Sequence, residues 1–192
     1  MTASLLAFDT STEHMAVALQ TRSGLQVWDG AGGAQASAQL IPMVQRLLHQ
    51  AGLDLSQLQA IAFGRGPGAF TGLRTACAVA QGLAFGAALP VLGLDSLMIV
   101  AEAARGDLPP LVDGGLDLHV AMDARMGEVY AGHYLWNRGR WAVQVSPALY
   151  TLEALNAAWR RCPPQAVVGS ALAAFGERLA PGPAQRLASS EQ

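Results

Sequence analysis

Residues 60–94 carry the sequence AIAFGRGPGAFTGLRTACAVAQGLAFGAALPVLGL, which divides into four successive elements. The apolar run 60–63 predicts a strand, and the glycine-rich segment 64–74 predicts a loop. A run of small residues to position 88 predicts a long helix, and the apolar run 90–94 predicts a second strand. A glycine-rich loop ahead of a helix is typical of phosphate-binding sites, so this stretch supplies the first functional hypothesis.

The glycine-rich loop departs from both common phosphate-binding motifs. A P-loop needs a lysine that reaches the phosphates, and all twelve basic side chains of this chain are arginine. Gly64, Gly66 and Ala69 formally match the dinucleotide fingerprint, with Asp95 closing the next strand. The chain is nevertheless predicted to stay irregular until about Thr71, a natural N-cap, which starts the helix too late for that fold. Dinucleotide binding therefore stays open only as a weaker alternative.

The helix that follows the loop is unusual because one side of it lacks bulk. Its interior glycines, Gly82 and Gly86, each cost about 1 kcal/mol relative to alanine, so the sequence must need the space. We expect another backbone to approach closely, either a helix of the same chain or a helix of another subunit. The small residues recur at every fourth position: Gly72, Ala76, Ala80, Ala84 and Ala88.

Composition and charge exclude several functional classes. With 192 residues, 52% hydrophobic and 14% charged, the chain can bury a full core in one domain or two small lobes. A net charge of −2 without lysine argues against unaided RNA binding. No signal peptide or membrane span is expected, because the start lacks basic residues and Gln81 and Pro90 interrupt the most apolar window. Cys77 and Cys162 indicate neither a disulfide framework nor a zinc site, so we expect a cytoplasmic protein.

The order of predicted elements is repeated in the two halves of the chain. The first half predicts strands at 4–9, 14–20 and 24–29, a helix at 38–51, a strand at 60–64, a helix from 71, a strand at 90–94 and a helix at 96–104. The second half predicts strands near 117–123, 128–136 and 140–145, a helix at 151–161, a strand at 166–169 and a helix from 170. We therefore expect an N-terminal lobe at 1–104, a linker at 105–116, a shortened C-terminal lobe at 117–180 and a polar tail at 181–192.

Each half opens with a strand that ends in an aspartate and enters a polar turn. In the first turn Asp9 is followed by Thr10 and Ser11, and in the second Asp123 is followed by a turn ending at Glu128. Paired turns of this kind hold the phosphates and magnesium of a nucleotide in sugar kinases and actin-like ATPases. Aspartate also closes turns without any ligand. Both interpretations stay open, and the first allows an ATP-dependent phosphotransferase that uses Asp9 and Asp123.

Four segments of the chain resemble the bacterial TsaB (YeaZ) family. They are residues 5–12, LLAFDTST; 63–74, FGRGPGAFTGLR; 80–84, AQGLA; and 121–130, AMDARMGEVY. The second and fourth segments are highly specific. The resemblance extends to about residue 136, and beyond residue 150 only the pattern of elements matches.

The resemblance implies a two-lobed α/β fold of the actin, Hsp70 and sugar-kinase class, in which each lobe is a ribonuclease-H-like unit. It also implies a non-catalytic subunit in the formation of N6-threonylcarbamoyladenosine (t6A) at position 37 of tRNAs that read codons beginning with A. The paralogue TsaD carries out the transfer, and the ATPase TsaE docks on the pair. The resemblance further implies that the subunit forms homodimers when it is alone and contacts tRNA only through the complex. No cofactor of its own is implied, with ATP or ADP at a subunit interface left open.

The first-lobe helices are where we expect the partner interface. The helix at 38–51 has a broad apolar stripe with a methionine that can adapt to different partners, and the small-residue helix runs beside it. The competing interpretation is that both helices only cover their own sheet. The predicted interface residues are Leu40, Met43, Val44, Leu47, Thr71, Gly72, Arg74, Thr75, Ala76 and Ala80.

No catalytic residue is predicted. The chain lacks the HxxxH or HExxH spacing that holds a metal on one helix face, so it does not offer the metal ligands that a metallopeptidase needs. Its histidines are His14, His49, His119 and His133. The chain departs from the family at Ala36, where relatives often carry a histidine. The expected short second lobe puts contacts made by the C-terminal lobe in doubt.

Overall fold

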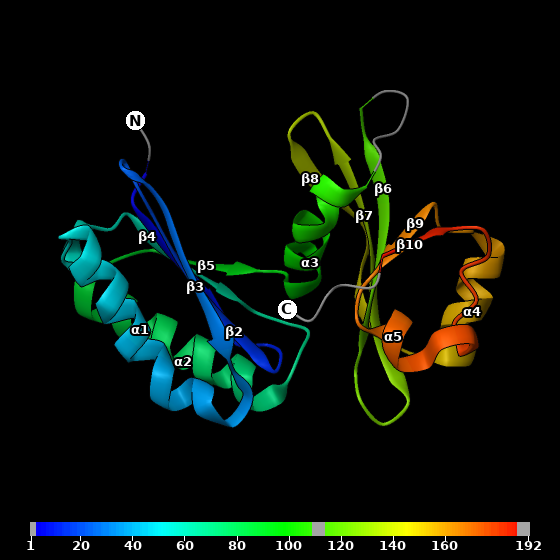
Figure 1. Ribbon diagram of the computed structural model, residues 1–192, viewed down its shortest axis with the longest axis horizontal. Coiled ribbons are helices and arrows are strands. Elements are labelled where there is room, and N and C mark those ends of the chain that lie inside the picture. The colour runs from blue at the N-terminus through cyan, green and yellow to red at the C-terminus, as the bar shows by residue number, and fades with distance from the viewer. Residues whose placement is uncertain (1–2, 109–113, 188–192) are drawn as a thin grey trace. The chain divides into compact units, whose positions relative to one another are not determined.

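The computed structural model describes residues 3–108 and 114–187, which form two compact units with their boundary after Ser96 (Figure 1). Unit 1 reaches Ser96 and unit 2 begins at Leu97. Each unit is an α/β assembly built on its own five-stranded sheet. Among the described residues, no helix is long and apolar enough to cross a membrane.

The sheet of unit 1 combines an antiparallel meander with two parallel strands. Its strands are β1 (Leu5–Asp9), β2 (His14–Thr21), β3 (Gly24–Ala31), β4 (Ala60–Gly64) and β5 (Val91–Leu94), in the spatial order β3-β2-β1-β4-β5. β2 pairs with β1 and β3 in antiparallel fashion, whereas β4 is parallel to β1 and to β5. Met15, Val17 and Leu19 on β2 are fully buried because alternate side chains of a strand face the core.

Two helices lie side by side along one face of this sheet (Figure 1). Helix α1 (Ala36–Ala51) begins two residues before the predicted start. It is capped by Gly52, whose left-handed backbone (φ 64°) lets its N–H reach the carbonyls of the last turn. Helix α2 (Phe70–Ala87) begins one residue before the predicted N-cap and is capped by Ala88. Both helices turn an apolar stripe toward the sheet and form one hydrophobic core with it.

The sheet of unit 2 repeats this topology. Its strands are β6 (Leu116–Asp123), β7 (Glu128–Asn137), β8 (Arg140–Thr151), β9 (Ala166–Val168) and β10 (Gln185–Leu187), in the order β10-β9-β6-β7-β8. The meander β6–β8 is antiparallel, and β9 is parallel to β6 and to β10. Each strand thus has a counterpart in unit 1, which confirms the duplicated ribonuclease-H-like fold. The turn between β7 and β8 lies at Arg138 and Gly139, as predicted.

Helices cover both faces of the second sheet (Figure 1). Helix α3 (Ser96–Ala104) packs with Leu118, Val120 and Tyr134 on one face. Helices α4 (Leu152–Arg161) and α5 (Ala171–Phe175) pack with the other face. Successive side chains of β6 therefore enter two different cores.

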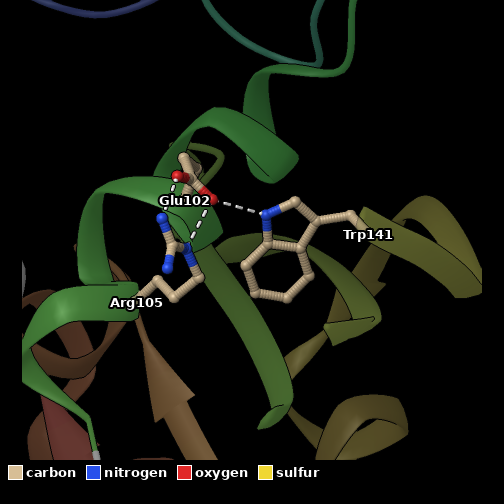
Figure 2. Close-up of polar contacts among 3 residues, drawn as sticks. All are labelled: Glu102, Arg105 and Trp141. Carbon is tan, nitrogen blue, oxygen red and sulfur yellow. Dashed lines mark hydrogen bonds and ion pairs between the residues drawn. The ribbon is translucent and has the colours of Figure 1, made fainter. Parts of the chain in front are cut away.

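A polar contact at the end of α3 fixes this helix to unit 2 (Figure 2). Glu102 accepts two hydrogen bonds from the Arg105 guanidinium, at 2.9 and 2.7 Å, and one from Nε1 of Trp141 on β8, at 2.8 Å. The bond from Arg105 is the main cause that lowers the pKa of Glu102. The Arg105 guanidinium also lies over the ring of Trp136, 4.4 Å from its centroid.

Three predicted boundaries are wrong. α3 belongs to unit 2 and not to the first lobe, because periodicity finds a helix but does not say which sheet the helix covers. The predicted tail contains β10, whose short polar sequence has no apolar run but supplies the fifth strand through backbone pairing. β8 continues to Thr151 rather than ending near 145. The predicted linker at 105–116 is partly structured, because it contains a short 3₁₀ helix at 105–107 and the first residue of β6, Leu116. Its residues 109–113 lie outside the described residues.

Candidate functional site

The turn after β1 is held by hydrogen bonds from its own unit. The Asp9 carboxylate accepts a hydrogen bond from the backbone N–H of Ser11 (2.6 Å) and another from the Ser96 hydroxyl (3.1 Å). The Thr10 hydroxyl donates to the carbonyl of Gly72 at 2.7 Å. Thr10 and Ser11 are buried. Asp9, Thr10 and Ser11, which were predicted for a nucleotide site, therefore already have partners within the chain.

The glycine-rich loop packs against this turn without side chains in between. A Cβ on Gly64 would overlap the Asp9 carboxylate, and a Cβ on Gly72 would overlap the Thr10 carbonyl. A Cβ on Gly68 would be 2.5 Å from the carbonyl oxygen of Ser11, which is also too close. Space for the Asp9 turn thus explains three glycines of the loop.

Backbone N–H groups of the same loop are already used inside unit 1. Arg65 donates to the Leu94 carbonyl (2.8 Å), Gly66 to the Ser96 hydroxyl (3.2 Å) and Ala69 to the Ser11 carbonyl (2.7 Å). A phosphate cradle depends on such N–H groups being directed at the ligand. This arrangement favours a structural role for the loop over a dinucleotide site.

The counterpart turn in unit 2 is built in a similar way but has a different tip. The backbone N–H of Arg125 donates to the Asp123 carboxylate (2.9 Å), and the backbone N–H of Asp123 donates to the Ser170 hydroxyl (3.1 Å). Arg125, Met126 and Gly127 then follow one another with positive φ angles. The side chain of Met126 is 98% exposed.

Six of the ten residues predicted for a partner interface lie in the core of unit 1. Periodicity identifies the apolar side of a helix, which is the side that covers its own sheet, so these six residues are unavailable to a partner in the folded unit: Leu40, Val44, Leu47, Gly72, Ala76 and Ala80. Thr71 and Arg74 are exposed on α2, and Met43 and Thr75 are half-buried. For these four, the interface stays a prediction.

The opposite side of α2 carries the two interior glycines noted in the sequence, together with two phenylalanines that periodicity did not single out. Phe70 is 67% exposed and lies 3.9 Å beneath the Arg74 guanidinium, and Phe85 is 92% exposed. Within the described part of the chain, a Cβ placed on Gly82 or Gly86 would meet no atom within 4 Å. We call this set the outer α2 surface; it consists of Phe70, Thr71, Arg74, Ala78, Gly82, Phe85 and Gly86. It is the candidate interaction surface of the molecule.

A second polar cluster lies on the second sheet, where two of the histidines meet. The rings of His119 and His133, which are paired across β6 and β7, stack with centroids 4.0 Å apart. Nε2 of His133 is 2.9 Å from an Asp117 carboxylate oxygen, and Nε1 of Trp159 donates to Nδ1 of His119 at 3.3 Å. Burial is the main cause that lowers the pKa of His119 to about 4, and the His133 ring adds to the effect.

This cluster escaped the sequence analysis because its members are joined by cross-strand register and not by helical spacing. The two rings are nearly parallel, with 17° between their planes, so their nitrogen lone pairs do not converge on one point. The indole N–H of Trp159 also occupies one ring nitrogen of His119. The side chains form a hydrogen-bonded network that is poorly arranged for metal ligation.

Comparisons with known proteins agree on one family. The family model described as TsaD, tRNA N6-adenosine threonylcarbamoyltransferase, matches residues 33–178. The tRNA threonylcarbamoyladenosine biosynthesis protein TsaB of Escherichia coli is 40% identical over 68% of the chain, and that of Haemophilus influenzae is 42% identical over 66%. The chain spans about half the length of these relatives, 54% and 51%. A solved structure of YeaZ from Pseudomonas aeruginosa, 38% identical, has a TM-score of 0.83 and covers 98% of this chain and 85% of its own.

Proposed function

Because the chain belongs to the TsaB (YeaZ) family, we propose that it is an accessory subunit for threonylcarbamoylation of adenosine 37 in tRNAs that read codons beginning with A. Relatives at 40% and 42% identity are named as tRNA threonylcarbamoyladenosine biosynthesis proteins. In this proposal the chain binds and supports a catalytic TsaD-like paralogue. A TsaE-like ATPase joins the pair, and tRNA is reached only through the complex.

The observation that carries the proposal is the pair of outward glycines on α2. Gly82 and Gly86 lower helix stability by about 1 kcal/mol each relative to alanine, and among residues 3–108 and 114–187 no atom comes within 4 Å of the place of their missing side chains. The core therefore does not account for them. A closely packed helix from another subunit does, since glycine lets two helix backbones approach.

Exposed aromatic side chains at both ends of the same surface support this interpretation. Phe70 and Phe85 lie mostly in solvent, and large aromatic residues of this kind dominate the binding energy of protein interfaces. Arg74 holds its guanidinium over Phe70 and adds a cation to the surface. The outer α2 surface thus has glycines, which lack side chains, between the exposed phenylalanines Phe70 and Phe85.

A TsaD-like paralogue is the favoured partner because the TsaD family model matches this chain. Two proteins of the same fold can present corresponding helices to each other. By the same argument, the chain alone would form a homodimer through this surface, in competition with the paralogue.

The polar turns support an accessory role over an enzymatic one. Asp9 is held by Ser11 and Ser96, and Asp123 is held by its own turn. An ATP-dependent phosphotransferase would need these carboxylates for magnesium and phosphate. Calorimetry of the isolated chain with ATP and magnesium separates the two functions, because the accessory role predicts no binding by the chain alone.

The test of the proposal is a reconstituted tRNA modification reaction. The chain should co-purify with the TsaD-like protein from the same cell, and t6A should form only when the chain is present. Equal t6A formation with and without the chain would refute the accessory role. Co-purification that survives Gly82→Leu, Gly86→Leu and Phe85→Ala would place the interface elsewhere.

A further inference from the structure

Strand β3 is an edge of the first sheet, and one side of its backbone faces no other strand among the described residues. Hydrogen bonds to β2 use the other side: the Gly32 N–H donates to the Glu13 carbonyl at 2.7 Å, and the two-residue turn pairs Thr21 with Gly24. Hydrogen-bonded and non-hydrogen-bonded pairs alternate along an antiparallel ladder. The odd-numbered residues of β3, from position 25 to position 31, therefore direct their N–H and C=O groups away from β2.

β3 lacks the features that commonly protect an edge strand from pairing. Its register with β2 runs through the whole strand without a bulge, and its sequence GLQVWDGA has no proline and one charged side chain, Asp29. Leu25 and Val27 point to the sheet face opposite α1 and are 61% and 59% exposed. The other long edge strand, β8, carries Pro147 and has an irregular register with β7. β3 is thus the more open of the two long edges.

The sequence of β3 is complementary to itself when two copies pair in antiparallel fashion about Gln26. In this register Leu25 of each copy lies opposite Val27 of the other, and both residues use their outward backbone groups. The two pairs bring four exposed apolar side chains together on one face of the joined sheet. A pairing centred on Val27 would instead place Leu25 opposite Asp29. The pattern of apolar and charged residues therefore selects the register centred on Gln26.

Gln26 has a hydrogen-bonding requirement that its own chain does not meet. Its Oε1 is buried and has no hydrogen-bond partner in the described part of the chain, and such an acceptor disfavours the folded state. Side chains of a non-hydrogen-bonded antiparallel pair lie close together. At the two-fold axis, the amide N–H of the second copy's Gln26 can therefore donate to this oxygen once the two side chains turn toward each other.

Charges at the two ends of β3 favour the antiparallel arrangement. Arg22 lies in the turn before the strand, and Asp29 lies near the end of the strand, where Glu13 adds a second carboxylate. In the register described, the second copy's Arg22 lies beside Asp29. The charged side chain of α1, Arg46, is exposed, and this helix packs mainly over β2. Opposite charges thus meet at both ends of the paired strands.

We propose that two copies of the chain pair through β3 in antiparallel fashion, with Gln26 at the two-fold axis, and so join their five-stranded sheets. The outer α2 surface takes no part, because α2 packs mainly over β4, which β1 and β2 separate from β3. A dimer paired through β3 leaves each copy able to bind a TsaD-like subunit. The inference goes beyond the proposed function and does not depend on it.

The test is sedimentation velocity of the Gly82→Leu chain over a series of concentrations. This substitution blocks association through the outer α2 surface, so the dimers that remain form through β3. Adding Val27→Lys should weaken these dimers about tenfold or more, because the pairing would bury two lysine charges without partners. Circular dichroism checks that the variant folds, as expected for a lysine on an exposed edge strand.

Val143→Lys in the same Gly82→Leu chain is the matched control. Val143 is an exposed apolar residue of the other long edge strand, β8. Its substitution adds the same charge to the chain and should leave the dimer unchanged.

Cross-linking tests the register independently of the lysine variants. Gln26→Cys in a Cys162→Ser chain should form an intermolecular disulfide under mild oxidation, because the two Cα atoms at the axis lie within the span of a disulfide. Asp29→Cys in the same chain should not, since its two copies lie on opposite sides of the axis and far from it.

Three outcomes overturn the inference. They are a Gly82→Leu chain that stays monomeric at every concentration, an equal loss of dimer in Val27→Lys and Val143→Lys, and equal cross-linking of the two cysteine variants. A failure of the proposed function is distinguishable, because these measurements use neither the TsaD-like protein nor tRNA.

Discussion

Gly64 and Asp9 lie so close that any side chain on the glycine would occupy the position of the aspartate carboxylate. The two residues end the neighbouring parallel strands β4 and β1. Ser96 completes the group by donating its hydroxyl to Asp9 and accepting the N–H of Gly66. The glycine-rich loop is therefore best understood through the turn that it encloses.

Gly64→Ala should destabilise unit 1. The added methyl group forces Asp9 away from Ser11 and Ser96, and overpacking with loss of these hydrogen bonds costs about 1–3 kcal/mol or more. Urea denaturation followed by circular dichroism measures the change. Gly82→Ala is the matched control; it should stabilise the chain by about 1 kcal/mol, because its site is open and helical. Equal stability of the two variants would contradict the packing described for the loop.

Gly82→Leu and Gly86→Leu should separate folding from association. Both substitutions improve helix propensity at exposed positions, so thermal stability of the isolated unit should stay equal or rise. Both also place bulk at the centre of the outer α2 surface and should weaken dimerisation or binding of the TsaD-like protein. Sedimentation velocity and pull-down measure the two associations. Ala173→Leu, on an exposed position of α5, is the control and should leave them unchanged.

Ala76→Leu and Ala80→Leu should act on folding first. Both alanines are fully buried between α2 and its sheet, and inserting three carbons into a packed core costs about 1–3 kcal/mol. The expected result is a lower urea midpoint for the monomer. If either variant were as stable as wild type while losing only its association, these positions would belong to an interface after all.

Stability should fall in mild acid because of His119. Its folded pKa of about 4 lies below the ordinary value of 6.5, so folding favours the neutral ring. The corresponding stability is fully present above pH 6.5 and is lost as the pH falls from 6.5 toward 4, with a slope of at most about 1.4 kcal/mol per pH unit. Of the groups that face the His119 ring, His133 lowers the pKa of His119 and Asp117 raises it. The Trp159 indole, which is uncharged, donates a hydrogen bond to the ring.

Denaturation midpoints at pH 7.5 and pH 5.0 measure this dependence. In His119→Gln the difference between the two midpoints should shrink, since the titrating group is gone. The exposed His49 supplies the control, and His49→Gln should show the wild-type difference. An unchanged difference in His119→Gln would assign the acid sensitivity to other groups.

Most of the elements could be predicted from the sequence, because their periodicity and their stop signals agree. The run of Met15, Val17 and Leu19 has the period of two that a half-buried strand requires, and Gly52 marks the end of α1. The repeated order of elements was enough to indicate a duplicated fold. Strand and helix positions depend on local patterns of this kind.

Tertiary assignments were less predictable. No local sequence pattern indicates that α3 packs on the second sheet, because Trp136 and Trp141, which fix the end of this helix, lie more than thirty residues further along the chain. β10 was missed because pairing with β9, not apolar side chains, makes Gln185–Leu187 a strand.

The sequence placed the candidate interface on α1 and α2 as a hypothesis, and six of its ten residues proved to be core. An apolar helical stripe is the strongest pattern in such a sequence, and in a two-layer α/β unit that stripe faces the sheet. The sequence pointed to Gly82 and Gly86, but their outward position is seen only in the structure, where a Cβ on either would meet no described atom within 4 Å and Phe85 is in solvent.

At Gly68 and Gly72 the nearest obstructing atom is a main-chain carbonyl oxygen, that of Ser11 and of Thr10 respectively. Main-chain atoms are the same in every residue, so no second substitution on the opposite segment can make room for a larger residue. These glycines are thus beyond compensatory mutation. A sequence motif of this kind is expected to resist change through evolution for reasons of packing alone, so its persistence is not by itself a sign of catalysis.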